Sequence, residues 1–356
     1  MKVLSLIGAR PQFIKEAILQ EKLKENGIQE IVVHSGQHYD YNMSDVFFKV
    51  LKMREPDYNL NVGSGSHAVV TGKIMIAFEE VVVKEKPDII VVYGDTNTTV
   101  AGALVGAKLK IPIAHVEAGI RQEPKDMPEE INRVLTDHVS TYLFCPSELA
   151  VENLEKENIK KEVYFVGDIM YDLFLKMKPY FDYSILRKYD LKENEYIVCT
   201  IHRDFNTDDP NKLKGILEGI SYIADLIKII FPVHPRTQKR IAEFGLESLL
   251  RNVIVTEPLD YLKMMGLLEN SLMVITDSGG LQKEAYFSGK RAIVLMPDTG
   301  WKELIELGWN KVTSPDNLFS CYQSMVSEEN RKPKNNVYGE GKAGEKIVNI
   351  IKGLIK

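Results

Sequence analysis

Short runs of β-branched and aromatic residues alternate with longer amphipathic stretches along the chain. Strands that alternate with helices in this way are typical of βαβ units built around parallel sheets. The strand candidates are residues 3–7, 31–33, 89–93, 197–199, 229–231, 253–255 and 273–275. The helix candidates are residues 11–25, 43–51, 72–84, 99–109, 129–139, 147–157, 211–223 and 281–288.

The alternation is interrupted near residues 167–191, where a stretch rich in Lys, Tyr and Asp separates two series of strands. A chain of 356 residues is long enough for two domains of ordinary size. We therefore predict an α/β fold with two Rossmann-like, parallel-sheet domains that face a central cleft. The expected bounds are 1–170 and 171–340, followed by a terminal helix at 341–356 that packs back, with the N-terminal domain as the candidate partner.

Composition narrows the classes of ligand and compartment. A net charge of -5 provides no general basic field for nucleic acid or a membrane surface, so an anionic ligand needs a locally basic pocket. The 3 cysteines follow no metal or disulfide spacing, which favours a reducing cytoplasm. The apolar start is too short for a signal peptide and is interpreted as a strand, and no apolar run has transmembrane length.

Polar clusters follow nearly every apolar run, at the point where each strand is expected to end. Ligands of open α/β sheets bind outside the carboxyl ends of the strands, whereas the alternative for any one cluster is ordinary turn chemistry. The clusters are Gly8-Ala9-Arg10, Ser35-Gly36-Gln37-His38, Gly94-Asp95-Thr96, His115-Val116-Glu117, His202-Arg203, His234-Pro235-Arg236, Glu257-Pro258 and Thr276-Asp277-Ser278-Gly279-Gly280.

The segment TDSGGLQKEA (276–285) follows a strand and opens a helix. Small residues such as Ser278, Gly279 and Gly280 let backbone N–H groups approach an anion, so a diphosphate fits, although a simple Ser N-cap is the alternative. Glu284 lies one turn into this helix, where it could accept from a ribose hydroxyl. Arg10 and Lys15 flank a similar strand-to-helix loop and are candidate phosphate partners, with a solvated surface pair as the alternative.

The acidic residues are the candidates for proton transfer. Asp95 and Glu117 end neighbouring strand candidates, and carboxylates gathered beside a cleft often do acid–base work. Glu129 and Glu130 begin a helix, where capping is the competing use. The His and carboxylate positions match no zinc spacing, so no metal is expected. The match to G-x-G-x-x-G at 339–344 lacks a preceding strand, so no dinucleotide cofactor is expected either.

Taken together and in this order, the motifs resemble those of the non-hydrolysing UDP-N-acetylglucosamine 2-epimerase family, over about residues 2–352. The matching segments are GARPQFIK (8–15), SGQHYD (35–40), GDTNTTVAGAL (94–104), HVEAGIR (115–121), MPEEINRVLTDH (127–138), IHRDFNTDD (201–209), VHPRT (233–237), EPLDYL (257–262) and TDSGGLQKEA (276–285).

The resemblance implies a GT-B-like fold, a UDP-sugar substrate, no cofactor, and a homodimer that supplies activated sugar for glycan synthesis. The UDP contacts that it implies are Arg10, His234, Ser278, Gly279, Gly280 and Glu284. The catalytic residues that it implies are Asp95, Glu117, Glu129 and His202. Gln37 and His38 fall in a segment that contacts a second, activating UDP-sugar in some members. The reaction implied is elimination of UDP followed by its re-addition, which inverts carbon 2 of the sugar.

One segment departs from the family pattern Arg-x-x-Thr-Glu-Arg-Pro-Glu. The chain has Met296 and Trp301 at the two arginine positions, and Trp301 supplies neither the charge nor the fork of arginine. This tryptophan is similar to the branch that acts on UDP-2,3-diacetamido-2,3-dideoxy-glucuronate, whose carboxylate could meet Lys302 or Arg203. Thr299 and Trp301 are accordingly candidate sugar contacts.

Four alternatives remain at this point. The first is the parent substrate, UDP-N-acetylglucosamine. The others are a GT-B glycosyltransferase, a hydrolysing epimerase that releases free sugar, and a UDP-sugar sensor without catalysis.

Overall fold

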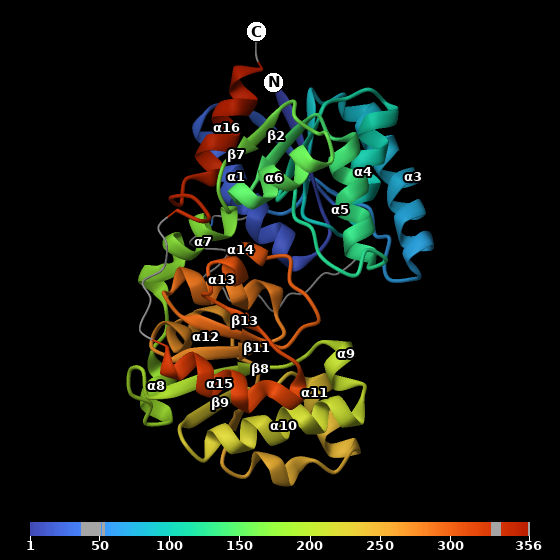
Figure 1. The fold of residues 1–356 in the computed structure, drawn as a ribbon. Coiled ribbons are helices and arrows are strands. Elements are labelled where there is room, and N and C mark those ends of the chain that lie inside the picture. The colour runs from blue at the N-terminus through green and yellow to red at the C-terminus, as the bar shows by residue number, and fades with distance from the viewer. Residues whose placement is uncertain (37–50, 52–53, 329–335, 355–356) are drawn as a thin grey trace. The chain divides into compact units, whose positions relative to one another are not determined.

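In this computed structural model the described residues are 1–36, 51, 54–328 and 336–354. The chain forms two compact units, each considered by itself (Figure 1). Unit 1 comprises Met1–Lys176 together with Asn335–Lys356, and unit 2 comprises Met177–Lys334. The C-terminal segment therefore returns to the unit in which the chain begins.

Unit 1 contains a parallel sheet in the order β3-β2-β1-β4-β5-β6-β7. Strand β4 is buried along its whole length, as expected of a central strand in a parallel sheet. The strands are β1 (Lys2–Ile7), β2 (Gln29–His34), β3 (Tyr58–Asn59), β4 (Ile89–Tyr93), β5 (Ile113–Val116), β6 (Tyr142–Cys145) and β7 (Val163–Phe165).

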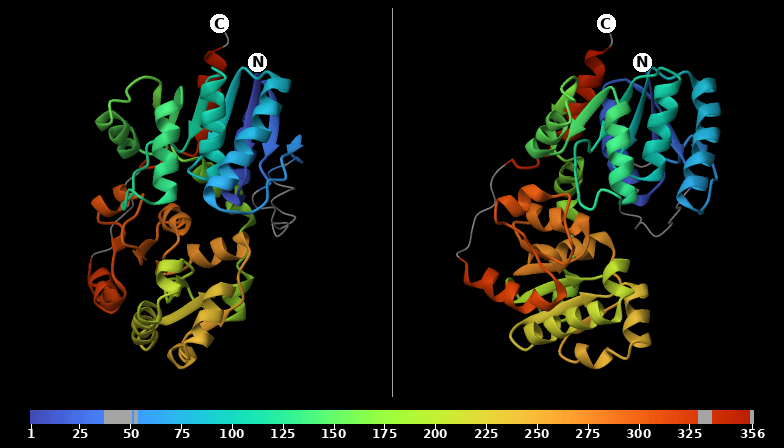
Figure 2. Two further views of the ribbon diagram at one scale, coloured as in Figure 1. Left: turned by 90° about the vertical axis from the view of Figure 1, so that its right-hand side faces the viewer. Right: turned by 45° about the vertical axis from the view of Figure 1, so that its right-hand side comes forward.

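Helices cover both faces of this sheet (Figure 2). Helices α1 and α16 pack together on one face, while α4 lies between α3 and α5 on the other. Gly102 of α4 faces the sheet so closely that an added Cβ would lie 2.6 Å from Leu6 Cδ2. The helices are α1 (Arg10–Glu25), α3 (His67–Glu85), α4 (Asn97–Lys108), α5 (Pro128–Val139), α6 (Glu148–Lys156), α7 (Ile169–Met177) and α16 (Ala343–Gly353).

Unit 2 contains a second parallel sheet in the order β10-β9-β8-β11-β12-β13, with a core of aliphatic residues such as Ile197, Ile229 and Ile275. Its strands are β8 (Tyr196–Thr200), β9 (Lys228–Pro232), β10 (Ile254–Thr256), β11 (Met273–Thr276), β12 (Arg291–Val294) and β13 (Lys311–Val312). Its helices are α8 (Ser184–Lys188), α9 (Asp204–Thr207), α10 (Pro210–Ala224), α11 (Pro235–Glu243), α12 (Tyr261–Glu269), α13 (Gly279–Phe287), α14 (Lys302–Glu306) and α15 (Leu318–Ser327).

The predicted fold class, α/β with two parallel sheets, is confirmed. Every strand candidate falls on an observed strand, with ends shifted by at most two residues. The pattern missed β3, β6, β12 and β13, because segments of two to four residues carry no recognisable period. The helix predicted at 43–51 falls almost entirely outside the described residues.

Helix α16 is attached to unit 1 by a side chain from α7. The Asp172 carboxylate accepts the backbone N–H groups of Ala343 and Gly344 at 3.0 Å and 2.8 Å. These donors belong to the first turn of α16, so Asp172 caps a helix that lies 171 residues further along the chain. Burial raises the pKa of Asp172 to about 6 in spite of these two bonds.

A buried carboxyl pair lies between α1 and the sheet of unit 1. Glu16 is 4% exposed and hydrogen-bonded to Glu30, which accepts from Ser5 Oγ at 2.6 Å. Burial, and next the charge of Glu30, raise the pKa of Glu16 well above its ordinary value of 4.5. Folded protein therefore keeps a proton on Glu16 at pH values where the unfolded chain has released it.

We expect Glu16→Gln to increase stability more at pH 8 than at pH 4. Below the unfolded-state pKa both states hold the proton, but above it only the unfolded state loses it, so wild-type stability falls as pH rises towards the folded-state pKa. Each unit between the two pKa values is worth about 1.4 kcal/mol. Urea unfolding at both pH values measures this difference, with Glu25→Gln on the exposed face of α1 as the control. An equal effect of Glu16→Gln at both pH values would contradict it.

Candidate active site

Two acidic residues follow neighbouring strands of unit 1, as predicted. Asp95 comes two residues after β4 and Glu117 comes directly after β5, and the register pairs Tyr93 with Val116 at these strand ends. Glu117 has a φ of 75°, a left-handed conformation that costs a residue with a side chain about 1–2 kcal/mol. Strain of this kind is concentrated at functional sites, where the surrounding structure enforces it.

Each of these carboxylates is held by a cation of its own unit. Lys15 Nζ of α1 lies 2.7 Å from Glu117 Oε2, with both side chains largely buried. Arg133 of α5 forms a short ion pair with Asp95 and lies 2.6 Å from Glu130. The carboxylates that follow β4 and β5 are therefore each paired with a largely buried cation.

Arg133 was not among the candidates taken from the sequence. Burial acts to lower its pKa, but the carboxylates of Asp95 and Glu130 outweigh burial and raise the pKa. Arg133 therefore remains a cation. The sequence feature that could have identified Arg133 is its position one turn after the acidic pair 129–130, on the same face of α5 as Glu130.

Glu129 and Glu130 occupy the first turn of α5 but differ in their surroundings. Glu130 is buried and its Oε2 accepts the backbone N–H of Gln122 at 3.0 Å. Glu129 is half-buried and lies in the same turn, directly before Glu130. Asn132, also in this part of α5, donates to the backbone O of Asp95 at 3.0 Å.

Gln12 joins the loop after β1 to the loop after β4. Its Oε1 accepts the N–H of Gly8 at 2.8 Å, and its Nε2 donates to Tyr93 O at 2.7 Å and to Thr96 Oγ1 at 3.0 Å. Gln12 is 2% exposed, so these bonds are made away from water. The glutamine fixes the backbone from which α1 begins at Arg10.

In unit 2 a buried aspartate organises the predicted His202-Arg203 cluster. Asp277 Oδ1 lies 3.0 Å from His202 Nδ1, and the carboxylate also accepts the backbone N–H of Arg203 at 2.9 Å and Asn206 Nδ2 at 3.1 Å. Burial acts to raise the pKa of Asp277, but hydrogen bonding to His202 and the other donors lowers it overall. Asp277 is a residue that sequence reasoning missed as a partner of His202.

Two helices of unit 2 begin with residues that the sequence singled out. Ser278 is the N-cap of α13 and accepts from Leu281 N at 3.4 Å, so the capping role weighed for it is present. His234 is the N-cap of α11, where its Nδ1 accepts from Arg236 N at 3.2 Å. Partial burial and then the charge of nearby His202 lower the pKa of His234, which favours a neutral ring.

The segment that departs from the family pattern packs against α13. Lys283 Nζ lies 3.7 Å from the centroid of the Trp301 ring, and both side chains are at least 90% buried. Thr299 Oγ1 donates to Gln282 Oε1 at 2.8 Å and accepts from Trp301 N at 3.2 Å. Lys302 lies 3.2 Å from the Asp298 carboxylate.

Some candidates cannot be placed. Gln37 and His38 lie outside the described residues, and only the backbone of Arg10 is described. Within the described ranges no group of three or more His, Cys, Asp or Glu residues could hold a metal ion. Among the helices described, none combines the length and the apolar character needed to cross a membrane.

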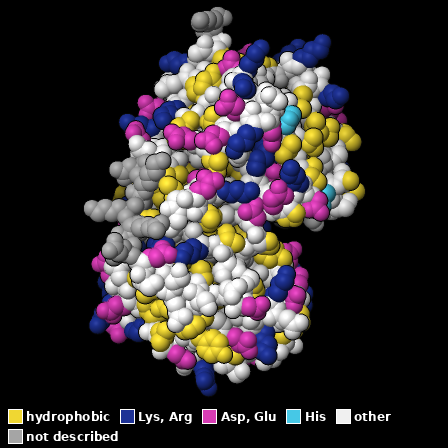
Figure 3. Space-filling model, viewed as in Figure 1, with side chains coloured by type: hydrophobic (Ala, Val, Ile, Leu, Met, Phe, Trp, Pro, Cys, Tyr) yellow, Lys and Arg dark blue, Asp and Glu magenta, His cyan; other side chains and the backbone are white. Residues whose placement is uncertain are grey.

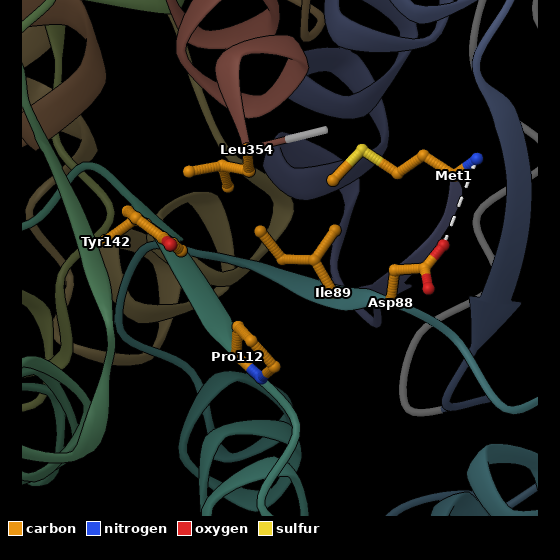
Figure 4. A pocket seen from close by; sticks show the side chains of 6 residues that line it. All are labelled: Met1, Asp88, Ile89, Pro112, Tyr142 and Leu354. Carbon is orange, nitrogen blue, oxygen red and sulfur yellow. Dashed lines mark ion pairs between the residues drawn. The ribbon is translucent and has the colours of Figure 1, made fainter. Parts of the chain in front are cut away.

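Two cavities belong to single units. One, of about 390 Å³, lies at the amino ends of strands in unit 1, whereas Asp95 and Glu117 follow the carboxyl ends. It is lined by Met1, Asp88, Ile89, Pro112, Tyr142 and Leu354 (Figure 4). The other, of about 710 Å³, lies in unit 2 beside β10 and includes Val233, Thr256 and Glu257. Only the second is near carboxyl strand ends, where ligands of parallel sheets bind.

A family model described as UDP-N-acetylglucosamine 2-epimerase matches residues 21–352. A Methanococcus maripaludis protein named UDP-N-acetylglucosamine 2-epimerase homolog is 42% identical over 360 residues, covering 99% of this chain and 100% of the relative. The chain belongs to the UDP-N-acetylglucosamine 2-epimerase family. The family identified from the motifs is thereby confirmed, and the chain is an isomerase of the UDP-sugar 2-epimerase class.

Relatives in this epimerase family differ in the sugar for which they are named. UDP-2,3-diacetamido-2,3-dideoxy-D-glucuronate 2-epimerase of Pseudomonas aeruginosa is 40% identical over 368 residues, covering 99% of this chain and 100% of the relative. The crystal structure of Methanocaldococcus jannaschii UDP-GlcNAc 2-epimerase with UDP-GlcNAc and UDP has a TM-score of 0.88 and 40% identity, covering 99% of this chain and 100% of that one. Sequence identity alone therefore does not decide which of the two UDP-sugars is the substrate.

Proposed function

We propose that this epimerase inverts carbon 2 of UDP-2,3-diacetamido-2,3-dideoxy-D-glucuronate, with UDP-N-acetylglucosamine as the alternative substrate. The observation that carries the reaction type is the pair of carboxylates, Asp95 and Glu117, held by Arg133 and Lys15 at neighbouring strand ends. A glycosyltransferase has no need for two such carboxylates.

The C2 proton of these sugars is not acidic, because no carbonyl group adjoins C2. In the proposed route the C1–O bond to UDP breaks while a carboxylate removes the C2 proton, which leaves a 2-acetamidoglucal and UDP. Protonation of C2 from the opposite face and re-addition of UDP to C1 complete the inversion. No electron acceptor is required, because the sugar is neither oxidised nor reduced.

The proposed roles fall on residues of both units. Asp95, Glu117, Glu129 and His202 are the proposed catalytic residues. Arg10, His234, Ser278, Gly279, Gly280 and Glu284 are the proposed UDP contacts, and Lys15 orders Glu117. The N-terminus of α13 supplies N–H groups and a partial positive charge where negative charge develops on the departing diphosphate.

Two observations favour the diacetamido-glucuronate. Among the described residues nothing accepts a hydrogen bond from the buried Nε of Arg203, so this donor is available to an anionic ligand. The Lys283–Trp301 contact lies beside Gly279, where an added Cβ would lie 3.7 Å from Trp301 Nε1, so the departing segment is next to the proposed diphosphate loop. A C6 carboxylate is the part of this sugar that the Arg203 guanidinium would recognise.

The deciding experiment incubates the enzyme separately with the two UDP-sugars in deuterium oxide. We expect inversion of the diacetamido-glucuronate with solvent deuterium at C2, and at least about 100-fold lower kcat/KM for UDP-N-acetylglucosamine, because a lost charged contact is worth about 3 kcal/mol. The reverse preference would make UDP-N-acetylglucosamine the substrate. An epimer without deuterium would exclude proton removal, and free sugar as the product would indicate a hydrolysing enzyme.

We expect Gly279→Ala to weaken UDP binding at least about tenfold while leaving the fold intact. Gly279 begins α13 in a helical conformation, and its added Cβ would make only an ordinary contact with Trp301. Alanine is favoured in helices, so the methyl group obstructs only a ligand that approaches the N–H groups. Calorimetric titration with UDP measures the effect, with Gly72→Ala in α3 as a control that also has open space. An unchanged UDP affinity would remove this loop from the proposed site.

We also propose a homodimer that functions in the cytoplasm. Apolar side chains gather over α3 (Figure 3), where Val69, Ile76 and Val83 are 49%, 68% and 57% exposed at a spacing of seven residues. The three cysteines carry free thiols, in agreement with a reducing compartment. Sedimentation velocity tests the assembly. A wild-type monomer at micromolar concentration, or a dimer that Ile76→Glu does not weaken, would contradict an interface at α3.

A further inference from the structure

A histidine and an aspartate of unit 1 form a buried pair that the proposed chemistry does not use. His115 lies in β5 and Asp137 in α5, and they are 0% and 1% exposed. His115 Nδ1 lies 2.7 Å from Asp137 Oδ1, and His115 Nε2 lies 2.7 Å from the backbone oxygen of Gly94. Both ring nitrogens are therefore within hydrogen-bond distance of an oxygen.

The nature of these two oxygens determines the state of the ring. A backbone carbonyl and a carboxylate only accept hydrogen bonds, so both nitrogens of His115 must donate. A ring that donates from both nitrogens is an imidazolium, and its charge-assisted bond to Asp137 is of the stronger kind. His115 and Asp137 thus form an ion pair rather than a neutral contact.

The surrounding groups make this ion pair sustainable in the interior. Asp137 Oδ2 accepts from Arg121 Nη1 at 2.7 Å and from Gly119 N at 3.1 Å, and Arg121 also makes two bonds of 2.7 Å to Glu157. Burial acts to raise the pKa of Asp137, but His115 and Arg121 lower it overall. The Cys145 thiol also lies near Asp137, and burial raises its pKa, so that it stays neutral.

The backbone atoms that this network holds are those that carry the two candidate carboxylates. Gly94, whose oxygen meets His115, immediately precedes Asp95 and has a φ of 65°. Glu117 follows His115 by two residues and has a φ of 75°, while Gly119, bound to Asp137, has a φ of 82°. Two of these left-handed residues, Gly94 and Gly119, are therefore hydrogen-bonded to one buried ion pair, and Glu117 lies in the chain between His115 and Gly119.

We propose that the His115–Asp137 ion pair is a positioning unit for epimerisation, which holds the backbone segments that carry Asp95 and Glu117. The inference rests on the proposed function. His115 is fully buried and bonded on both sides, so it does not touch substrate and is not a catalytic residue. The competing explanation is a neutral histidine that only fills the core.

The protonation state is tested on the wild-type protein by nitrogen NMR of ¹⁵N-labelled enzyme, with the ring signals assigned by through-bond correlation to the backbone of His115. We expect both ring nitrogens of His115 to carry a proton at pH 7. A ring with one unprotonated nitrogen at pH 7 would overturn the proposal. This measurement requires no turnover, so its outcome can be distinguished from failure of the proposed function. If the proposed function fails, the wild-type enzyme inverts neither UDP-sugar.

Kinetics test the positioning role. We expect His115→Gln to lower kcat about 10–100-fold with KM within about threefold, because the displaced carboxylates act in the chemical step. His138→Gln, on the exposed part of α5, is the matched control and should leave kcat and KM unchanged.

A purely structural role would lower the folded fraction without changing kcat of the folded enzyme, and an unchanged kcat in folded His115→Gln would overturn the proposal. Asp137→Asn provides the second variant, because it removes the negative partner while keeping the shape of the side chain. It should reproduce the loss in kcat with little change in KM. If neither variant folds, the nitrogen spectrum of the wild type decides between an imidazolium and a neutral ring.

Discussion

Asp95→Asn is expected to lower kcat for C2 epimerisation by about 1,000-fold or more, with UDP affinity within about threefold of wild type. Removing a general acid or base typically costs between 100-fold and 10,000-fold in rate. Asparagine keeps the shape of the side chain but neither takes up nor releases a proton near neutral pH. The proposed UDP contacts belong largely to unit 2, so the diphosphate is still bound. The measurement is turnover of the preferred UDP-sugar together with UDP titration.

The structure offers a matched control for Asp95. Arg133 contacts two carboxylates, those of Asp95 and Glu130, and Glu130 is buried at the start of α5. Glu130→Gln therefore removes one partner of Arg133 without removing the proposed proton-transfer group. We expect less than about a tenfold loss from this variant. Equal losses from both variants would mean that Asp95 acts through Arg133 rather than on substrate.

The second large effect concerns stability. We expect Gly167→Ala to lower the free energy of unfolding by about 3 kcal/mol. Gly167 has a φ of 95°, and an added Cβ would lie 2.8 Å from Tyr338 O and 3.1 Å from Gly339 Cα. The methyl group thus adds overpacking against a backbone that cannot move aside, about 1–3 kcal/mol, to conformational strain of about 1–2 kcal/mol.

This close approach joins the end of the first sheet to the C-terminal segment of unit 1. Asp168 N donates to Tyr338 O at 2.9 Å directly beside Gly167. Urea unfolding followed by circular dichroism measures the loss, and hydrogen exchange reports whether α16 has become detached. Gly27→Ala is the control, because Gly27 has a φ of 68° with nothing within 4 Å of an added Cβ. It carries only the conformational strain, so equal destabilisation by both variants would remove the packing argument.

The elements of the site could be predicted because their signals are local. A buried strand shows as an apolar run, and the polar turn that follows it marks the strand end, so residues 89–93 lead directly to Asp95. The small residues of 276–280 likewise predicted the start of α13. The family motifs also predicted the type of reaction, since their order along the chain is itself a property of the sequence.

The partners of these residues could not be predicted. The pairing of Arg133 with Asp95 joins positions 38 apart, and that of His202 with Asp277 joins positions 75 apart. Which of several nearby cations or carboxylates lies within reach depends on how helices cross a sheet, and periodicity carries no information on that crossing. The left-handed conformation of Glu117 could not be predicted either, because glutamate does not favour this conformation.

The sequence by itself thus determined the order of strands and helices, the residues placed at the strand ends and the family, because hydrophobic period, turn chemistry and motif order are properties of short segments. Only the tertiary structure decided that α16 is capped by Asp172, that Lys15 holds Glu117, and that His115 is buried against Asp137. Each of these depends on groups distant in the chain becoming neighbours away from water, where an unpaired polar group is costly and its partner is therefore specific.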